Sequence, residues 1–200
     1  MKSISRGARV CLCMVAAVVA VVAIARPLNL RAQTIGEREE FTAVAIVNNN
    51  LASGAGTVLM RVTRWSTESE RSRLISTLKS KGPDKLLDEL KDMKSVGTIR
   101  TPDSLGYDLR YAHQSPAPDG GRQIVIATDR PIGFWEASHQ PRTIQYPFTV
   151  IQMQIGADGR GKGTLSYATK ITVHGNTIEL ENFATQPVML TDIKAEKTKH

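Results

Sequence analysis

The sequence predicts a mainly β, α+β domain: a single antiparallel β-sandwich or barrel of about nine strands with an inserted two-helix hairpin. Two observations lead to this prediction. From residue 41 onward, short runs rich in β-branched and aromatic residues alternate with clusters of Gly, Pro, Asn and Asp. Over residues 67–93, in contrast, the apolar residues recur at a helical spacing. The pattern leaves open whether the strands form a sandwich or a barrel.

The predicted strands follow one another at short intervals. They cover residues 41–48, 56–65, 96–101, 106–114, 122–129, 143–155, 162–173, 176–183 and 187–196. Because the segments between most of them are short and rich in turn-forming residues, we expect neighbouring strands to pair antiparallel in sequence order.

Alternation within two of these strands predicts which side chains share a face. Tyr107, Leu109 and Tyr111 alternate with polar residues, so we expect all three on the buried side of one strand. Leu165 and Ile171 belong to a longer run with the same period, and we expect them on one face as well.

The helical hairpin has clear end signals. Thr67 and Glu70 have the spacing of a capping box, Gly82 is a typical C-terminal residue, and Pro83 suits the first position of a second helix. Each helix carries one apolar stripe, formed by Leu74, Ile75 and Leu78 in the first and by Leu86, Leu87, Leu90 and Met93 in the second. We expect the hairpin to pack as a lid on a sheet face or barrel end; a partner-binding or gating element is the alternative.

Residues 1–32 have the layout of a cleavable signal peptide. Lys2, Arg6 and Arg9 precede an apolar run over residues 10–25, which Arg26 closes. The run is shorter than the roughly 20 residues of a membrane-spanning helix, so we expect no permanent membrane anchor.

Cleavage after Ala25 or after Ala32 fits the small-residue rule, and the second is favoured. The expected product is one β-rich domain over residues 33–200, exported to the periplasm or beyond the cell, with a frayed C-terminal tail.

Removal of the leader changes the charge and cysteine content. Five of the 26 Lys and Arg residues lie in residues 1–32, whereas all 19 Asp and Glu residues follow them. The exported domain is therefore close to neutral, which argues against nucleic-acid binding. Cys11 and Cys13 are the only cysteines of the sequence, so the domain is expected to contain no disulfide and no cysteine-ligated metal.

The segment over residues 129–146 is the strongest candidate for a ligand-binding loop. It is the longest break between predicted strands, and it mixes charged and aromatic residues. The candidate ligand-binding residues are Arg130, Phe134, Trp135, Glu136, His139, Arg142 and Tyr146. Two structural alternatives remain: Phe134 and Trp135 plug the end of the core, and Asp129 forms an ion pair with Arg130.

No motif indicates a specific chemistry. Glu136 and His139 are spaced for a metal on a helix, but no third ligand accompanies them, and no metal or cofactor is predicted. Residues 156–163 resemble a phosphate-binding loop, but a strand pattern follows them, so a hairpin turn is predicted. The hydroxyls of Ser104 and Ser138 lack the partners of a nucleophile.

Three segments carry a resemblance to other proteins: TPDSLGYDLRYA (101–112), ATDRPIGFWEA (127–137) and IELENFATQPVMLT (178–191). Through them the chain resembles a group of uncharacterised exported bacterial proteins, over nearly the whole of the expected domain. The resemblance implies a single secreted domain, and it brings no activity, ligand or catalytic residue.

Three functional hypotheses follow from the sequence. The leading one is a non-enzymatic extracytoplasmic domain that binds a small apolar or amphipathic ligand or a protein partner through the aromatic loop. The second is a hydrolase-type enzyme acting on an envelope or extracellular substrate with Glu136, His139 and Arg142. The third is a structural interaction module with an exposed apolar patch.

Overall fold

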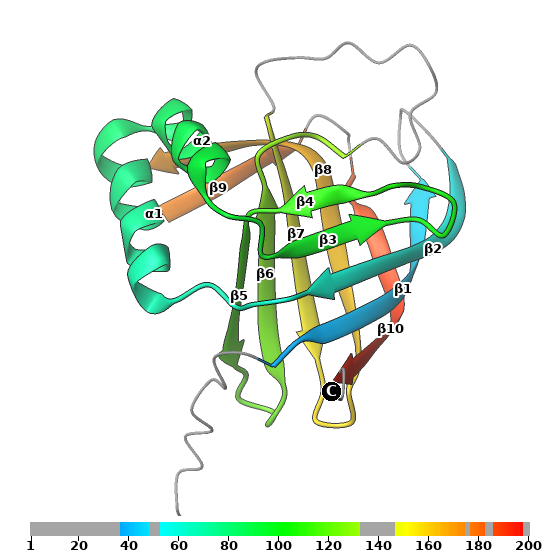
Figure 1. Cartoon of the computed structure of the whole chain (residues 1–200). Coiled ribbons are helices and arrows are strands. Elements are labelled where there is room, and N and C mark those ends of the chain that lie inside the picture. Colours follow the sequence, from blue (N-terminus) through cyan, green and yellow to red (C-terminus); the bar gives the residue numbers. More distant parts are fainter. Residues whose placement is uncertain (1–36, 49–52, 133–146, 175–176, 183–185, 198–200) are drawn as a thin grey trace, which may run out of the picture. The chain divides into compact units, whose positions relative to one another are not determined.

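The computed structural model describes residues 37–48, 53–132, 147–174, 177–182 and 186–197 (Figure 1). Within these residues the chain forms ten strands and two helices. In chain order they are β1 (Glu39–Asn48), β2 (Ser53–Val62), α1 (Glu68–Lys81), α2 (Pro83–Asp92), β3 (Gly97–Arg100), β4 (Tyr107–Leu109), β5 (Tyr111–Pro116), β6 (Arg122–Thr128), β7 (Phe148–Ile155), β8 (Arg160–His174), β9 (Thr177–Asn182) and β10 (Val188–Lys197). The predicted mainly β fold with an inserted helical hairpin is confirmed.

All ten strands belong to one antiparallel sheet. The hydrogen-bonded order is β4-β3-β2-β1-β10-β8-β7-β6-β5, and β9 pairs with the far half of β8. Neighbours in sequence pair as predicted, with two exceptions: β4 and β5 lie at the two ends of the order, and β10 pairs with β1 and β8 and not with β9. The last strand therefore joins a first group of strands, β1 to β4, to a second group, β5 to β9.

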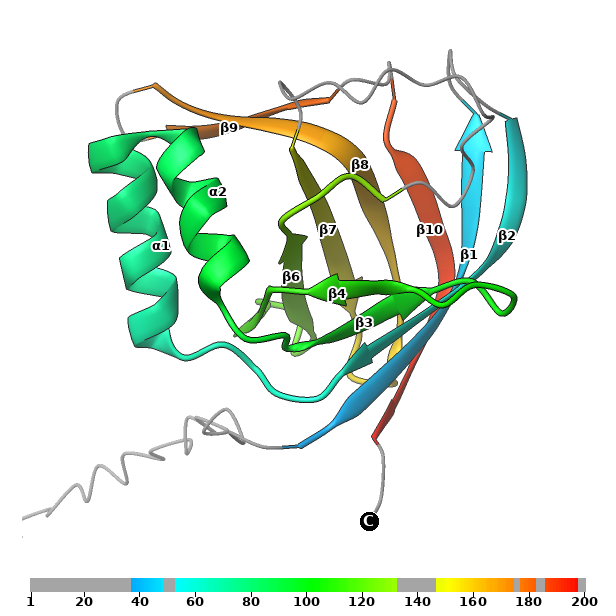
Figure 2. The same ribbon diagram turned by 45° about the horizontal axis from the view of Figure 1, so that its top comes forward.

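The two end strands of this order, β4 and β5, are consecutive in the chain and are separated only by Arg110. The backbone N–H of Arg110 donates to the carbonyl oxygen of Ala127 in β6, at a distance of 3.0 Å. The sheet therefore curls until its two ends meet at one residue, although no ladder closes it (Figure 2).

This junction overturns the prediction of one strand over residues 106–114 with three side chains on a single face. Leu109 lies in the cluster inside the curled sheet, whereas Tyr111 packs into a second cluster under the helices. The reason is the change of partner at Arg110: β4 pairs with β3, β5 pairs with β6, and the inward-facing position moves from Leu109 to Ala112.

The inner face of the curled sheet is filled by apolar side chains. They come from β1 to β8 and β10 and from the connecting segments, and none is more than 5 % exposed. The largest include Phe41, Met60, Leu109, Ile126 and Ile151. Strict alternation along β1, with every second residue buried, shows how a period of two supplies this cluster.

The helical hairpin has the predicted ends. The backbone N–H of Glu70 donates to the Thr67 hydroxyl, and the Glu70 carboxylate accepts from the backbone N–H of Thr67, as in a capping box. Gly82 ends α1 with φ of +83°, and Pro83 begins α2. In the described part of the chain, no helix is both long enough and apolar enough to span a membrane.

The hairpin packs on the outer face of the sheet, next to β8 and β9 (Figure 2). Its buried residues and the strand residues beneath them form a second cluster, made by Leu74, Leu78, Leu86, Leu90, Met93, Phe148, Val150 and Ile171. The first half of β7 is consequently buried on both faces, whereas Gln152 and Gln154 farther along it are exposed. The predicted lid on a sheet face is confirmed.

A second shift of face occurs in β8. Leu165 lies in the inner cluster, but Ile171 lies under the helices, which contradicts the prediction that they share a face. The register explains the change: Val150 pairs with Ser166 and Phe148 with Thr169, so β8 carries one extra residue here. A bulge of this kind reverses the faces of all residues beyond it.

The two ends of the curled sheet differ. Glu39 at the start of β1 pairs with Lys197 at the end of β10, whereas Thr128 and Thr149 lie at the opposite end. At the end of the sheet that holds Glu39 and Lys197, both Nη groups of Arg122 donate hydrogen bonds to the buried Glu39 carboxylate. This ion pair crosses from β6 to β1 and lies over the Phe41 ring, so polar groups cover this end of the inner cluster.

Candidate functional site

Of the seven candidate ligand-binding residues, the structure describes only Arg130. Phe134, Trp135, Glu136, His139, Arg142 and Tyr146 lie outside the described residues, as does Ser138. The site is therefore built from the residues where the segment 129–146 leaves β6 and where the chain re-enters the sheet in β7.

Two buried threonines hold the start of this segment. The Thr128 hydroxyl accepts from the Arg130 N–H at 3.1 Å, and both Thr128 and Thr149 donate to the Arg130 carbonyl oxygen, at 3.2 and 3.0 Å. The Thr149 hydroxyl also accepts from the Ile132 N–H at 3.0 Å. Ile132 itself is buried in the inner cluster, so residues 128–132 are fixed by both hydrogen bonds and packing.

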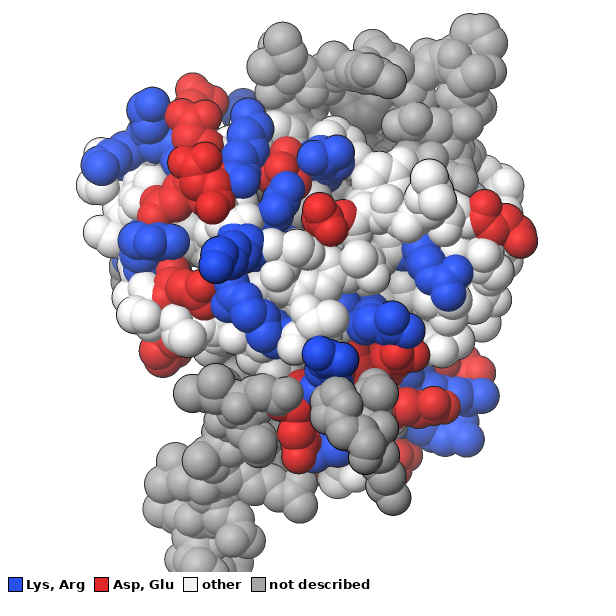
Figure 3. Space-filling model, in the orientation of Figure 1, with Lys and Arg blue, Asp and Glu red and all other residues white. Residues whose placement is uncertain are grey.

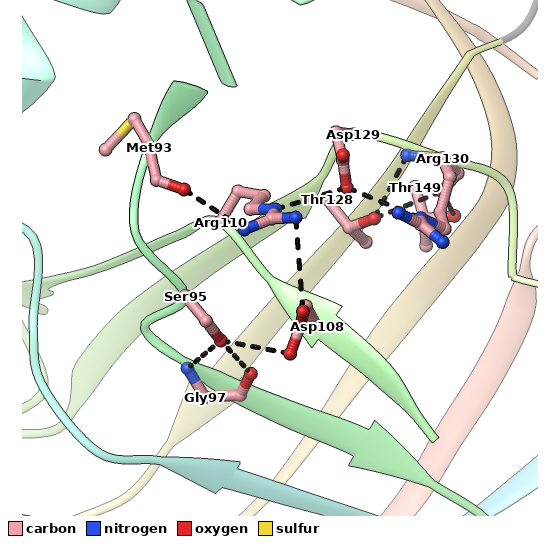
Figure 4. A network of polar contacts seen from close by, with 9 residues as sticks. All are labelled: Met93, Ser95, Gly97, Asp108, Arg110, Thr128, Asp129, Arg130 and Thr149. Atoms are coloured by element: carbon pink, nitrogen blue, oxygen red, sulfur yellow. Dashed lines mark hydrogen bonds and ion pairs between the residues drawn. The ribbon is translucent and has the colours of Figure 1, made fainter. Parts of the chain in front are cut away.

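A buried carboxylate lies beside these threonines, between two arginines. Asp129 Oδ1 is 3.4 Å from Arg110 Nε and 3.6 Å from Arg130 Nε (Figure 4). The Asp129 side chain is 5 % exposed, the Arg110 side chain 17 % and the Arg130 side chain 55 %. The predicted ion pair of Asp129 and Arg130 is confirmed, whereas the more deeply buried partner of Asp129, Arg110, was not predicted from the sequence.

Arg110 connects this site to the helical hairpin. Its Nη1 donates to the carbonyl oxygen of Met93, the residue that ends α2, at 3.1 Å, and its Nη2 is 3.9 Å from Asp108. Asp108 also accepts from the Ser95 hydroxyl, which in turn donates to the Gly97 carbonyl oxygen (Figure 4). The Arg110 side chain thus joins three parts of the structure: the end of α2, the junction of the end strands β4 and β5, and the residues that begin the segment 129–146, which we call its stem.

The charges of this network balance. Arg110 and Arg130 face Asp108 and Asp129, so neither guanidinium lies without a carboxylate. Buried arginines bind carboxylates and phosphates well when they are free to do so. Here the carboxylates come from the chain itself, and the network fixes the backbone rather than offering an anion site.

A second polar group lies where α1 meets the outer face of β5. The rings of Tyr111 and His113 stack with centroids 6.2 Å apart, and His113 Nε2 is 3.9 Å from a carboxylate oxygen of Glu68 in the first turn of α1. Burial raises the pKa of Tyr111 to about 12. Burial lowers the pKa of His113, with Arg71 adding to this effect and Glu68 opposing it.

The remaining motifs have structural roles in the described residues. Gly156 and Arg160 close the β7–β8 hairpin, which confirms the predicted hairpin turn, although β8 begins at Arg160 and the turn is shorter than residues 156–163. The Ser104 hydroxyl accepts from the Thr101 N–H within the β3–β4 turn. Within the described part of the chain, no group of three or more His, Cys, Asp and Glu side chains is placed to hold a metal ion.

Apolar side chains are exposed on one part of the outer sheet face. Val44 and Ile46 of β1 and Met189 of β10 are three of the four large hydrophobic residues exposed among those described; Leu105, on the β3–β4 turn, is the fourth. Lys, Arg, Asp and Glu gather over the helices and the lower part of the sheet, whereas by β2 and the β3–β4 turn a blue and a red group stand apart within a larger white area (Figure 3).

Comparison with protein-family models, with curated proteins and with solved structures found no match to this chain.

Replacing Asp129 should test the buried network. We expect Asp129→Asn to lower the free energy of unfolding by about 2 kcal/mol, because Arg110 would stay buried with its nearest carboxylate removed. Urea unfolding measures this change. The matched control is Asp192→Asn, which removes an exposed carboxylate that also lies near two cations, Arg160 and Lys194. It should change stability by less than about 0.5 kcal/mol; equal effects of the two substitutions would contradict this account.

The lowered pKa of His113 predicts a loss of stability in mild acid. Above the pKa of an unfolded histidine, about 6.5, His113 is neutral in both states and has no effect. As the pH falls below that value, the unfolded chain takes up the proton first, so the folded state loses stability. We expect His113→Gln to flatten the curve of unfolding free energy between about pH 6.5 and pH 5. An unchanged slope in the variant would show that other groups cause it.

Proposed function

We propose that this protein is an exported, non-enzymatic binding domain that contacts its target through the segment 129–146. The observation that carries the proposal is the stem of that segment, where Thr128, Thr149 and the Asp129 carboxylate fix the backbone at the end of the sheet. Binding loops on a rigid scaffold lose little entropy in their supporting residues when the target binds.

A protein partner is the target that the packing favours. The inner faces of the described strands are filled by side chains that pack on one another; the buried members of this cluster are no more than 5 % exposed, and Tyr107 and Ala195 are partly buried against them. A small apolar ligand held between these faces would have to displace that core. Contact from outside, at the end of the sheet, requires no such rearrangement, and aromatic residues such as Trp135 are typical anchors of protein interfaces.

The topology is compatible with an exported domain that presents this end to a target. The described chain begins beside Lys197, at the opposite end of the sheet from Thr128 and Thr149. A leader that precedes residue 37 therefore joins the domain far from the stem of the proposed binding segment.

Export predicts a defined mature N-terminus. We expect protein isolated from the periplasmic fraction or the medium of the producing cells to begin at Gln33, because the small-residue rule favours cleavage after Ala32. Intact-mass spectrometry measures this directly. A mass that begins at Arg26 would place the cleavage site after Ala25, whereas recovery of the whole chain from the cytoplasm would contradict export.

Site-specific crosslinking tests the binding segment. We expect a photoreactive phenylalanine analogue at Trp135 to form a discrete adduct with another protein of the same compartment when irradiated in living cells. Mass spectrometry of the adduct identifies the partner, and an adduct of twice the chain's own mass identifies a second copy.

The control places the same probe at Leu105, a fully exposed residue on the β3–β4 turn. No adduct at Trp135, or the same adducts from both positions, would contradict the proposal. Native mass spectrometry of the protein from its own host covers the small-ligand alternative, which predicts a retained compound in place of a protein adduct.

A further inference from the structure

The outer surface of β2, β1 and β10 is the part of the sheet that lies away from the helical hairpin (Figure 2). Its outward residues are those that alternate with the inner cluster along each strand. We call this surface, together with Thr164 of the neighbouring strand β8, the side face and define it by Val44, Ile46, Ala55, Thr57, Thr164 and Met189.

The register makes the side face continuous. Ile46 lies opposite Met189 on one side and opposite Ala55 on the other, and Met189 lies opposite Thr164 of β8. Val44 is one step along the same face and lies opposite Thr57. Three large apolar side chains that are 38 to 48 % exposed therefore lie on adjacent strands, surrounded by small uncharged residues.

Charge distinguishes the side face from the rest of the outer surface. None of its six residues is charged, and several of the charged groups farther down the same strands are paired within the chain, whereas Lys162, two residues from Thr164 in β8, is an exposed charged residue next to this face. Arg61 Nε lies 2.7 Å from Glu40, and Asp192 lies 3.5 Å from Arg160 and 3.8 Å from Lys194. The six residues of two copies can meet without like charges facing each other, and none of the six requires an opposite charge from a different partner.

We infer that the side face binds a second copy of this chain, so that two sheets pack face to face across a two-fold axis. An interface between two identical patches is self-complementary by symmetry, which an uncharged surface with a central apolar group satisfies. Stacked sheets lie about 10 Å apart, a distance that side chains of the size of Ile and Met fill.

The size of the side face sets the strength of this association. At about 4.8 Å between strands and about 3.3 Å per residue, four strands and the uncharged length of β1 cover roughly 19 by 20 Å. This area is about half of the roughly 800 Å² that each partner contributes to a standard interface. We therefore expect a weak dimer that forms over roughly 10 µM to 1 mM. The inference is independent of the proposed function, because the segment 129–146 takes no part in it.

Sedimentation velocity of the exported chain over this concentration range tests the inference. The wild-type protein should shift from the mass of one chain to that of two as the concentration rises. Ile46→Lys and Ile46→Glu should each weaken the association at least about tenfold, because each places like charges near the two-fold axis. An equimolar mixture of the two variants should recover it, since Lys and Glu then face each other.

Leu105→Lys is the matched control, because it adds the same charge at an exposed hydrophobic residue outside the side face. It should dimerise like the wild type. The recovery in the mixture distinguishes loss of contact from loss of folding, since two misfolded variants would not restore each other. A single-chain mass at every concentration, or equal weakening by Leu105→Lys, would overturn the inference.

Discussion

The fold depends on the position of Arg110 at the meeting point of the two ends of the sheet. Its backbone passes directly from β4 to β5, the two end strands, and its N–H donates a hydrogen bond to the Ala127 carbonyl oxygen of β6. Its guanidinium forms an ion pair with Asp129 and donates a hydrogen bond to the carbonyl oxygen of Met93 at the end of α2. A cation in this place is tolerated because carboxylates and a carbonyl replace the water that it loses.

This junction determines which side chains the inner and outer faces of the sheet carry. Because the chain changes partners at Arg110, Ala112 turns inward and Tyr111 turns outward to meet the helices. The bulge in β8 likewise places Ile171 on the outer face, under the helices. The outer face therefore gains a second apolar cluster, which the helical hairpin covers, whereas no element of the described residues covers the outer face of β1 and β10.

Local patterns predicted the elements better than the way the elements join. The capping box at Thr67, the helix end at Gly82 and most strand positions follow from short-range residue preferences, and the structure confirms them. The two changes of face do not follow from such preferences, because alternation indicates a strand but not where it exchanges partners or gains a residue. The placement of β10 between β1 and β8 is likewise set by long-range packing.

In the candidate site, too, contacts between sequence neighbours could be predicted, whereas contacts between distant residues could not. Asp129 and Arg130 are adjacent in the sequence, so their ion pair could be predicted, whereas Arg110 lies in a strand pattern where a charged residue is expected to face solvent. The pairing of Glu39 with Arg122 joins residues far apart in the chain and left no local signal.

Packing and these polar contacts must together hold the domain if the leader is removed, because both cysteines lie within it. The polar contacts lie at the two ends of the inner cluster, with Glu39 and Arg122 at one end and the Arg110 network at the other. At the ends of a curled sheet, apolar side chains would meet water. Charged groups that are paired within the chain can cover these side chains at a lower free-energy cost than exposing them.

The side face differs because its apolar residues lie on the outer surface of the strands, where no element of the described chain covers them. The inferred contact between two copies would remove the apolar side chains of this face from water.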